Sequence, residues 1–432
     1  MTSEQSNLFR RATKNFGKVL SGKAVGAAIS LIYLALAARG LGTNGFGIVI
    51  LIHSYMLMCT RIVSFKSYDI IVKYGAEFLT ANRKKDFQDL IKFTFLLDFF
   101  AAFFGILLGT LVVYLWGHNF GIPSDAIPLA VIYCVLIISN VTDTTTGILR
   151  ICDRFDIVAF LAIVEPTVRL IGVTIAFFSD SPWQAYLMSW FAARISYFCI
   201  SLVVAAYELS RKNLLQSFSW KIPQPTLRNP KIWRFSWSSN FYGSTNSIGI
   251  QFTTLAVGSL IGASGAALFK VAQELAEASA KAAIVFSSAL YPELARLATS
   301  PQGNVQIRRV VYKAAKSSVF IGFIFTGLLV LTGELILPNF FGQQFSDAYG
   351  TMVILSIATS ILLITYPYEA ALYSIGKPHI ALFIKFSVTL AQLIALLIML
   401  QSVGIVGAGY AAVLSSVLSA IALVYMTNRQ IS

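Results

Sequence analysis

Twelve long apolar stretches constrain this chain more than any other feature of its sequence. A helix needs roughly 20 mostly apolar residues to cross a hydrocarbon core about 30 Å thick, and each stretch is long enough to do so. We therefore expect an all-α polytopic membrane protein. The stretches lie at about 16–38, 46–65, 90–116, 126–149, 155–178, 183–208, 237–258, 265–290, 314–333, 349–372, 378–401 and 405–426.

The positive charges follow the order of these stretches. Lys and Arg cluster before the first stretch, after every even-numbered stretch up to the tenth, and at the C-terminal end, whereas the alternate connections carry only Arg39. Because loops rich in Lys and Arg stay in the cytoplasm, we expect both termini to be cytoplasmic. The formal charge of +14 then reflects topology, and we expect no nucleic acid as a partner.

A glycine-dense corner joins the first two stretches. Residues 39–47 read Arg-Gly-Leu-Gly-Thr-Asn-Gly-Phe-Gly, and residues 261–265 repeat this motif as Ile-Gly-Ala-Ser-Gly. A second motif, at 119–121, recurs at 339–342. Glycine adopts positive φ without steric cost, so we expect several positive φ angles in the first corner. Its glycines are Gly40, Gly42, Gly45 and Gly47.

These repeats predict two copies of one unit. An even number of helices per copy gives both copies the same orientation, so the axis that relates them runs along the membrane normal. The fold class we expect is 12 transmembrane helices in two six-helix bundles with this pseudo-two-fold axis and a cleft between them. The boundaries are 1–208 for the first lobe, 209–236 for a basic cytoplasmic linker rich in Pro and Trp, and 237–432 for the second lobe.

Charged residues near the bilayer midplane are the candidate site, because a charge at the centre of a membrane helix costs roughly 2.5 to 3.5 kcal/mol. Glu165 and Arg169 are spaced i,i+4 and can pair on one helix. Arg194 has no carboxylate three or four residues away. Its partner is therefore either a carboxylate on another helix or a bound anion.

A second charged set lies in the eighth stretch, where 4-3-4 spacing places four side chains on one helical face. The set either forms internal ion pairs or lines a water-filled cavity. In the first half of the chain, Arg61 occupies the position equivalent to Lys281, the last residue of this set. These two cations therefore either face the cleft or extend toward the headgroups. The four residues are Lys270, Glu274, Glu277 and Lys281.

Carboxylates in the same spans are candidates for ion coupling. Asp143 lies in a polar run that is either a coupling-ion site or a hydrated helix end, and Glu369 follows Pro367, which we expect to distort the tenth stretch. The candidate coupling residues are Asp143, Glu165, Glu274, Glu277 and Glu369; the candidate anion-binding cations are Arg61, Arg169, Arg194, Lys270 and Lys281.

No enzymatic motif is present. The sequence contains no Walker A, GxSxG or HExxH pattern, and its three histidines have no metal-binding spacing. We therefore expect no enzyme activity, no cofactor and no metal site.

The opening of the chain resembles a known family. A basic N-terminal segment, then a helix that ends Ala38-Arg39-Gly40-Leu41-Gly42 and continues Gly45-Phe46-Gly47, resembles the Wzx-like O-antigen flippases of the multidrug/oligosaccharidyl-lipid/polysaccharide (MOP) exporter superfamily. The resemblance implies that undecaprenyl-pyrophosphate-linked oligosaccharide crosses the bacterial inner membrane, from the cytoplasmic to the periplasmic leaflet, by alternating access. It also implies coupling to an ion gradient or the membrane potential, and a polysaccharide polymerase and a chain-length regulator as candidate partners.

Two other functions stay open at this point. A MATE-type drug/cation antiporter of the same superfamily would need a cavity dominated by carboxylates, whereas the carboxylates here are matched by cations. The other is a non-transporting membrane scaffold for polysaccharide assembly, for which neutralising the buried cations would change nothing.

Overall fold

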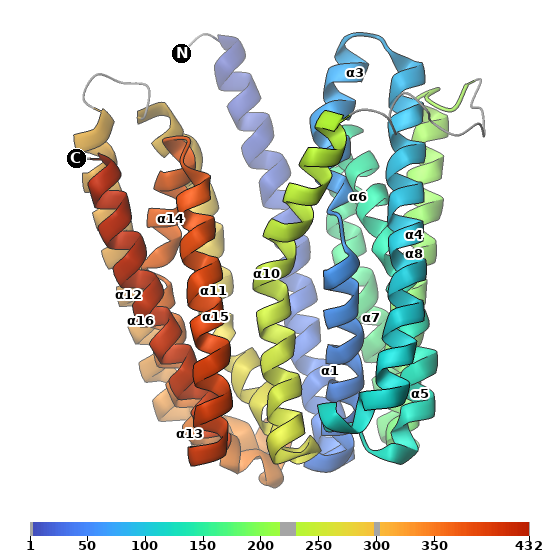
Figure 1. The fold of residues 1–432 in the computed structure, drawn as a ribbon, viewed down its shortest axis with the longest axis vertical. Helices are drawn as coiled ribbons and strands as arrows, with labels where there is room; N and C mark the ends of the chain where they lie inside the picture. The colour runs from blue at the N-terminus through green and yellow to red at the C-terminus, as the bar shows by residue number, and fades with distance from the viewer. Residues whose placement is uncertain (1–2, 217–229, 298–302, 432) are drawn as a thin grey trace. The chain divides into compact units, whose positions relative to one another are not determined.

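The chain is helical throughout the part that the structure describes. The computed structural model describes residues 3–216, 230–297 and 303–431, and Figure 1 shows their helices. The α-helices are α1 (Ser3–Val63), α2 (Ser67–Ile70), α3 (Ala76–Thr80), α4 (Lys84–Trp116), α5 (Ile127–Tyr133), α6 (Thr142–Ile151), α7 (Phe155–Phe178), α8 (Trp183–Arg211), α10 (Pro230–Ile261), α11 (Ala263–Leu297), α12 (Gly303–Ile336), α13 (Tyr349–Leu362), α14 (Thr365–Ser374), α15 (Pro378–Val403) and α16 (Val406–Ile431).

Short 3-10 and π segments join some of these helices. The π segments are η1 (Ile71–Gly75) and η5 (Leu337–Phe341); the 3-10 segments are η2 (Gly117–Phe120), η3 (Ser124–Ala126), η4 (Cys134–Val141) and η6 (Gln343–Ala348).

The expected membrane character is confirmed. In the described residues, nine helical stretches are long and apolar enough to cross a membrane. The first of them, Gly17–Thr80, is 64 residues long and contains the predicted corner. Among the described residues, α11 is not one of these stretches; it carries the four charges of the second set. The number of twelve spans stays a prediction.

The corner at 39–47 differs from the expectation in one respect. Gly42 is its only residue with positive φ (64°), and α1 continues as a helix on both sides of it. Gly47 is needed for close packing instead, because a Cβ at this position would lie 1.9 Å from the carbonyl oxygen of Ala263 at the start of α11. The corner therefore needs one special φ angle and a close helix contact, rather than several special φ angles.

The backbone repeats itself as the sequence motifs do. Residues with positive φ occur in four pairs whose members lie 220 to 224 positions apart, and a left-handed residue is uncommon enough for this register to be informative. Breaks within the spans repeat too: η4 interrupts the fourth predicted stretch, and α13 ends at Leu362, shortly before Pro367, as expected. The pairs are Gly42 and Gly262, Gly121 and Gly342, Asp153 and Gly376, and Asp180 and Gly404.

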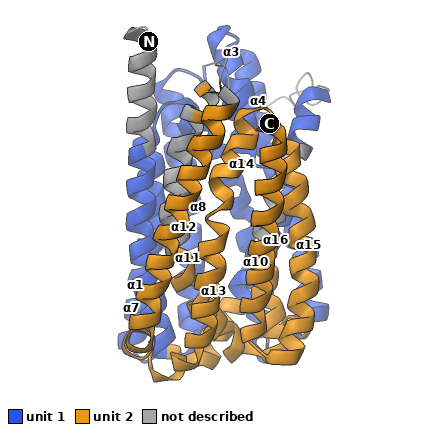
Figure 2. Cartoon of the chain, turned by 90° about the vertical axis from the view of Figure 1, so that its left-hand side faces the viewer, with its two compact units in different colours: residues 1–40, 52–118, 123–248 blue, residues 41–51, 119–122, 249–432 orange. Residues whose placement is uncertain are grey.

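The described chain forms two compact units, coloured in Figure 2. Unit 1 contains residues 1–40, 52–118 and 123–248, and unit 2 contains 41–51, 119–122 and 249–432. Within unit 1, α7 packs on α8; within unit 2, α16 packs on both α13 and α15. The pairing of α7 with α8 positions the site described next. The proposed lobe boundaries at the linker stay a prediction.

Candidate functional site

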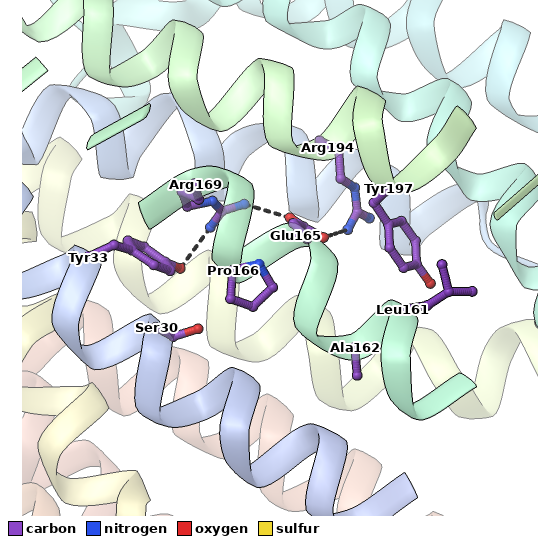
Figure 3. Close-up of a pocket in the computed structure, with 9 residues that line it drawn as sticks. All are labelled: Ser30, Tyr33, Leu161, Ala162, Glu165, Pro166, Arg169, Arg194 and Tyr197. Carbon is purple, nitrogen blue, oxygen red and sulfur yellow. Dashed lines mark hydrogen bonds and ion pairs between the residues drawn. The ribbon is translucent and has the colours of Figure 1, made fainter. Parts of the chain in front are cut away.

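A pocket of about 350 Å³ lies in unit 1 between α1, α7 and α8 (Figure 3). Its charged lining residues are Glu165, Arg169 and Arg194. Glu165 is the eleventh residue of α7 and Arg194 the twelfth of α8, which places them roughly 15 Å from the start of their helices at 1.5 Å per residue. The pocket therefore lies well inside the span. Its other lining residues are Ser30, Tyr33, Leu161, Ala162, Pro166 and Tyr197.

One carboxylate accepts hydrogen bonds from two guanidinium groups in this pocket. Arg169 donates from Nη2 to Oε1 of Glu165 at 2.6 Å, and Arg194 donates from Nη1 to Oε2 of the same residue at 2.9 Å (Figure 3). Two positive charges and one negative charge leave the group with a net charge of +1. We call Glu165, Arg169 and Arg194 the charged triad.

The remaining contacts fix the two arginines in place. Arg169 also donates to the Tyr33 hydroxyl at 2.9 Å, and its guanidinium lies 4.5 Å from the centre of the Trp190 ring. Arg194 donates from Nε to the Ser139 hydroxyl at 2.9 Å. Arg169 is 6% exposed. Guanidinium groups held by aromatic faces and hydroxyls keep a fixed geometry, which is what recognition of an anion requires.

Unmatched hydrogen-bond donors accompany the triad. In the described part of unit 1, three buried N–H groups have no acceptor: Nε of Arg169, Nε1 of Trp190 and Nδ2 of Asn140. Trp190 stacks against Arg169, and Asn140 follows the residue that accepts from Arg194. A buried donor without a partner costs about 1 to 3 kcal/mol. The triad thus carries positive charge, and buried donors without acceptors accompany it.

The structure answers the question that the sequence left open for Arg194. Its partner is a carboxylate on a neighbouring helix, α7. The pair that the sequence predicts between Glu165 and Arg169 forms as well, so three of the predicted residues come together in one place. The predicted role of these residues in binding stays a prediction.

None of the other predicted residues whose side chains the structure describes lines this pocket. Lys270 and Glu274 of α11 form an ion pair of 2.8 Å. Glu277 and Lys281 lie on the same helix, and the side chain of Lys281 is outside the described residues. Glu369 in α14 accepts from the Tyr373 hydroxyl at 3.3 Å and lies 3.8 Å from Lys385 Nζ.

Asp143 belongs to a second buried polar group in unit 1. It accepts a hydrogen bond from the Ser64 hydroxyl at 2.9 Å, just after α1 ends. Asp98, which is fully buried, accepts from Ser67 at 2.6 Å and from Thr144 at 2.7 Å. The polar run is therefore hydrogen-bonded to the residue after α1 and, through Asp98 of α4, to α2; its role stays a prediction. Arg61, in the last turn of α1, is exposed.

Sequence reasoning missed three residues of these groups. Asp98 is the only carboxylate in the third apolar stretch, a property that the sequence shows. Tyr33 and Trp190 reach Arg169 from α1 and α8, and nothing in their local sequence distinguishes them from aromatic residues that face lipid.

Comparison with known proteins agrees with this architecture. Residues 12–298 match the family described as "Polysaccharide biosynthesis protein". The chain belongs to this family. A curated relative, Inner membrane protein YghQ of Escherichia coli (strain K12), is 28% identical over 346 residues, which cover 79% of the chain and 95% of the relative.

Solved structures of MOP transporters share the fold. An inward-facing MATE family multidrug transporter superposes with a TM-score of 0.74 at 14% identity, covering 96% of this chain and 94% of the transporter. The lipid II flippase MurJ, in an inward closed conformation, gives 0.72 at 13% identity over 94% and 87%. A Pyrococcus furiosus MOP transporter, described as having a binding pocket of reverse polarity, gives 0.65 at 13% over 97% and 95%. The chain is a multi-pass membrane protein of the MOP transporter and flippase fold, as expected.

Proposed function

We propose that this protein is a flippase for lipid-linked oligosaccharides that carry a diphosphate, moving surface-polysaccharide repeat units such as O-antigen from the cytoplasmic to the periplasmic leaflet. The observation that carries the proposal is the charged triad, a net-positive group inside the span with unmatched donors around it. A diphosphate supplies the negative charge and the acceptor oxygens that this group lacks, and arginine binds phosphate through paired N–H donors. The undecaprenyl chain stays in the bilayer throughout.

The location and mechanism follow from the same proposal. The relative's name supports a place in the bacterial inner membrane, and the distribution of Lys and Arg supports cytoplasmic termini. The repeated backbone supports alternating access between two bundles around a fixed site. Two aromatic side chains that line the pocket beside the triad, Tyr33 and Tyr197, offer apolar faces to the sugar next to the diphosphate.

A strain that lacks the gene tests this proposal. Complementation with the natural chain should restore surface polysaccharide, whereas Arg194→Gln should not, although the protein is present in the membrane in equal amount. Arg83→Gln is the matched control, because Arg83 is about half exposed and pairs with Asp86 at the start of α4. Restored polymer with Arg194→Gln would contradict the proposal and would support the scaffold function instead.

Drug or cation antiport is the second candidate, since MATE transporters share the fold. A cationic drug would have to displace two arginines from one carboxylate, and the net charge of the triad repels it. Expression in a strain without its own efflux pumps separates the two functions. Unchanged sensitivity to cationic dyes supports the flippase, and lowered sensitivity supports the antiporter.

A further inference from the structure

An unusually long 3-10 segment interrupts the fourth predicted stretch. η4 (Cys134–Val141) is eight residues long and joins α5 to α6. Runs of 3-10 helix longer than three or four residues are uncommon, and a run in the middle of a helix often marks a functional position. η4 packs against α4 and against α8, the helix that carries Arg194.

The segment changes the direction in which its side chains point. A 3-10 helix turns by about 120° per residue and an α-helix by about 100°, so each residue of η4 adds about 20° relative to a continuous helix. Ser139 is the sixth residue of η4, and its side chain is therefore turned by roughly 120° from the direction it would take in an unbroken helix. In this direction its hydroxyl accepts the hydrogen bond from Nε of Arg194 at 2.9 Å.

The contact leaves one nitrogen of the Arg194 guanidinium open. Nε donates to Ser139 and Nη1 donates to Glu165. Nη2 has no hydrogen-bond partner in the described part of the chain, and it is not one of the buried atoms without a partner. Because Arg194 lines the pocket and Ser139 does not, Nη2 is the nitrogen of Arg194 that a bound phosphate oxygen can reach, and the protein holds the other two.

We infer that Ser139 is a positioning residue, which holds Nε of Arg194 from η4 so that Nη2 faces the phosphate of the lipid. The inference rests on the proposed function and makes anion binding depend on a residue outside the pocket. A guanidinium held at two nitrogens has less freedom to lose when a phosphate binds than one held at a single nitrogen. Asp143 also interacts electrostatically with Arg194, but its hydrogen bond goes to Ser64, so it does not orient the guanidinium in the same way.

The second half of the chain provides a matched control. Ser360 lies 221 positions after Ser139, within the offsets of the repeat, near the end of α13. Both serines are buried, and the Ser360 hydroxyl is hydrogen-bonded to the hydroxyl of Thr326 at 2.9 Å. Ser360→Ala therefore removes a buried hydroxyl from a helix of unit 2 without changing a contact of an arginine, whereas Ser139→Ala removes the contact to Arg194.

The affinities of the reconstituted full-length protein for a polyprenyl diphosphate and for the polyprenyl alcohol of equal length test this assignment. Their ratio measures recognition of the anion, because a purely structural loss weakens the binding of both lipids alike. We expect S139A to lower the ratio about 5-fold, which corresponds to one hydrogen bond. S139T keeps the hydroxyl and should stay within about two-fold of the natural ratio, and S360A should keep the natural ratio.

A double-mutant cycle separates positioning from a structural role. If Ser139 acts through Arg194, S139A/R194Q should bind the diphosphate as R194Q does, because no guanidinium is left to orient. The inference is overturned if S139A keeps the natural ratio, or if S139A lowers the affinity for the diphosphate by the same factor in the natural chain and in R194Q.

The two proposals fail in different ways. If the natural chain binds the two lipids equally, the pocket is not an anion site, and the flippase proposal is wrong together with the role of Ser139. If the natural chain prefers the diphosphate, R194Q loses this preference and S139A keeps it, the flippase proposal stands and the role of Ser139 is wrong.

Discussion

The triad of unit 1 and the Lys270–Glu274 pair of unit 2 start from the same sequence pattern and end differently. Each contains two opposite charges spaced i,i+4 on one helix, at 2.6 Å for Glu165 and Arg169 and at 2.8 Å for Lys270 and Glu274. In the triad a third charge, Arg194, joins from a neighbouring helix. Local spacing thus gives the pair of Glu165 and Arg169, and a partner from a neighbouring helix turns that pair into a site with net charge.

This difference predicts that only the pair in α11 tolerates reversal of its charges. E165R/R194E would place a second arginine four residues from Arg169 on α7 and move the carboxylate to position 194 on α8, so Arg169 would lose its ion pair of 2.6 Å. An uncompensated buried charge costs about 3 to 5 kcal/mol, so we expect no translocation and a clearly lower unfolding temperature in detergent.

K270E/E274K is the matched reversal in α11. The reversed pair can form at the same i,i+4 spacing, with the acid now N-terminal to the base, which is the better order. We expect translocation within about two-fold of the natural chain, since such a pair is worth about 0.2 to 0.5 kcal/mol. Equal losses in both reversals would show that the two pairs do not differ as described.

Neutralising the cross-helix arginine gives the next largest effect. Arg194→Gln removes one charge-assisted contact to the diphosphate, worth about 1.5 to 3 kcal/mol. The initial rate of translocation in vesicles at low substrate should fall roughly 10- to 150-fold. Arg83→Gln should keep the natural rate. An unchanged rate for Arg194→Gln would show that the triad is not the anion-binding site.

A smaller effect is expected from the hydroxyl that orients Arg169. Tyr33→Phe removes its hydrogen bond of 2.9 Å and keeps the ring, which costs about 1 kcal/mol, or about 5-fold in rate. Tyr114→Phe, at an exposed tyrosine of α4, is the control. If both variants translocate at the same rate, the orientation of Arg169 does not limit transport.

The smallest effect is expected from Lys270→Gln. Loss of one partly exposed i,i+4 pair changes the free energy by about 0.2 to 0.5 kcal/mol, so the rate should fall by about two-fold or less. A loss as large as that of Arg194→Gln would place α11 in the anion site and remove the contrast between the two groups.

Much of the fold was predictable from the sequence because bilayer thickness sets the length of each span and the charges of the loops set its orientation, one span at a time. Span lengths, the repeat offset and the break before Pro367 depend on residues within one helix or one turn. The pair of Glu165 and Arg169 was predictable for the same reason. The shared carboxylate was not, since it depends on how α8 packs on α7, and helical periodicity gives a side chain's face without giving its neighbour on the next helix.

The glycine corner shows a similar limit. The motif predicts a corner within residues 39–47, and the structure has a kink there at Gly42, where φ is 64°. The same motif suggested further positive φ angles, yet the role of Gly47 is to let α1 approach the backbone of Ala263. Composition alone does not separate a glycine that turns the chain from a glycine that admits a neighbour.

The most direct test of the central claim is the affinity of the reconstituted protein for two lipids that differ only in the diphosphate. Binding of a polyprenyl diphosphate and of the polyprenyl alcohol of equal length should be measured for the natural chain and for Arg194→Gln. We predict that the natural chain binds the diphosphate at least about 10-fold more tightly than the alcohol, and that Arg194→Gln loses most of this preference. Equal affinity for the two lipids, or a preference that persists in Arg194→Gln, would contradict the account.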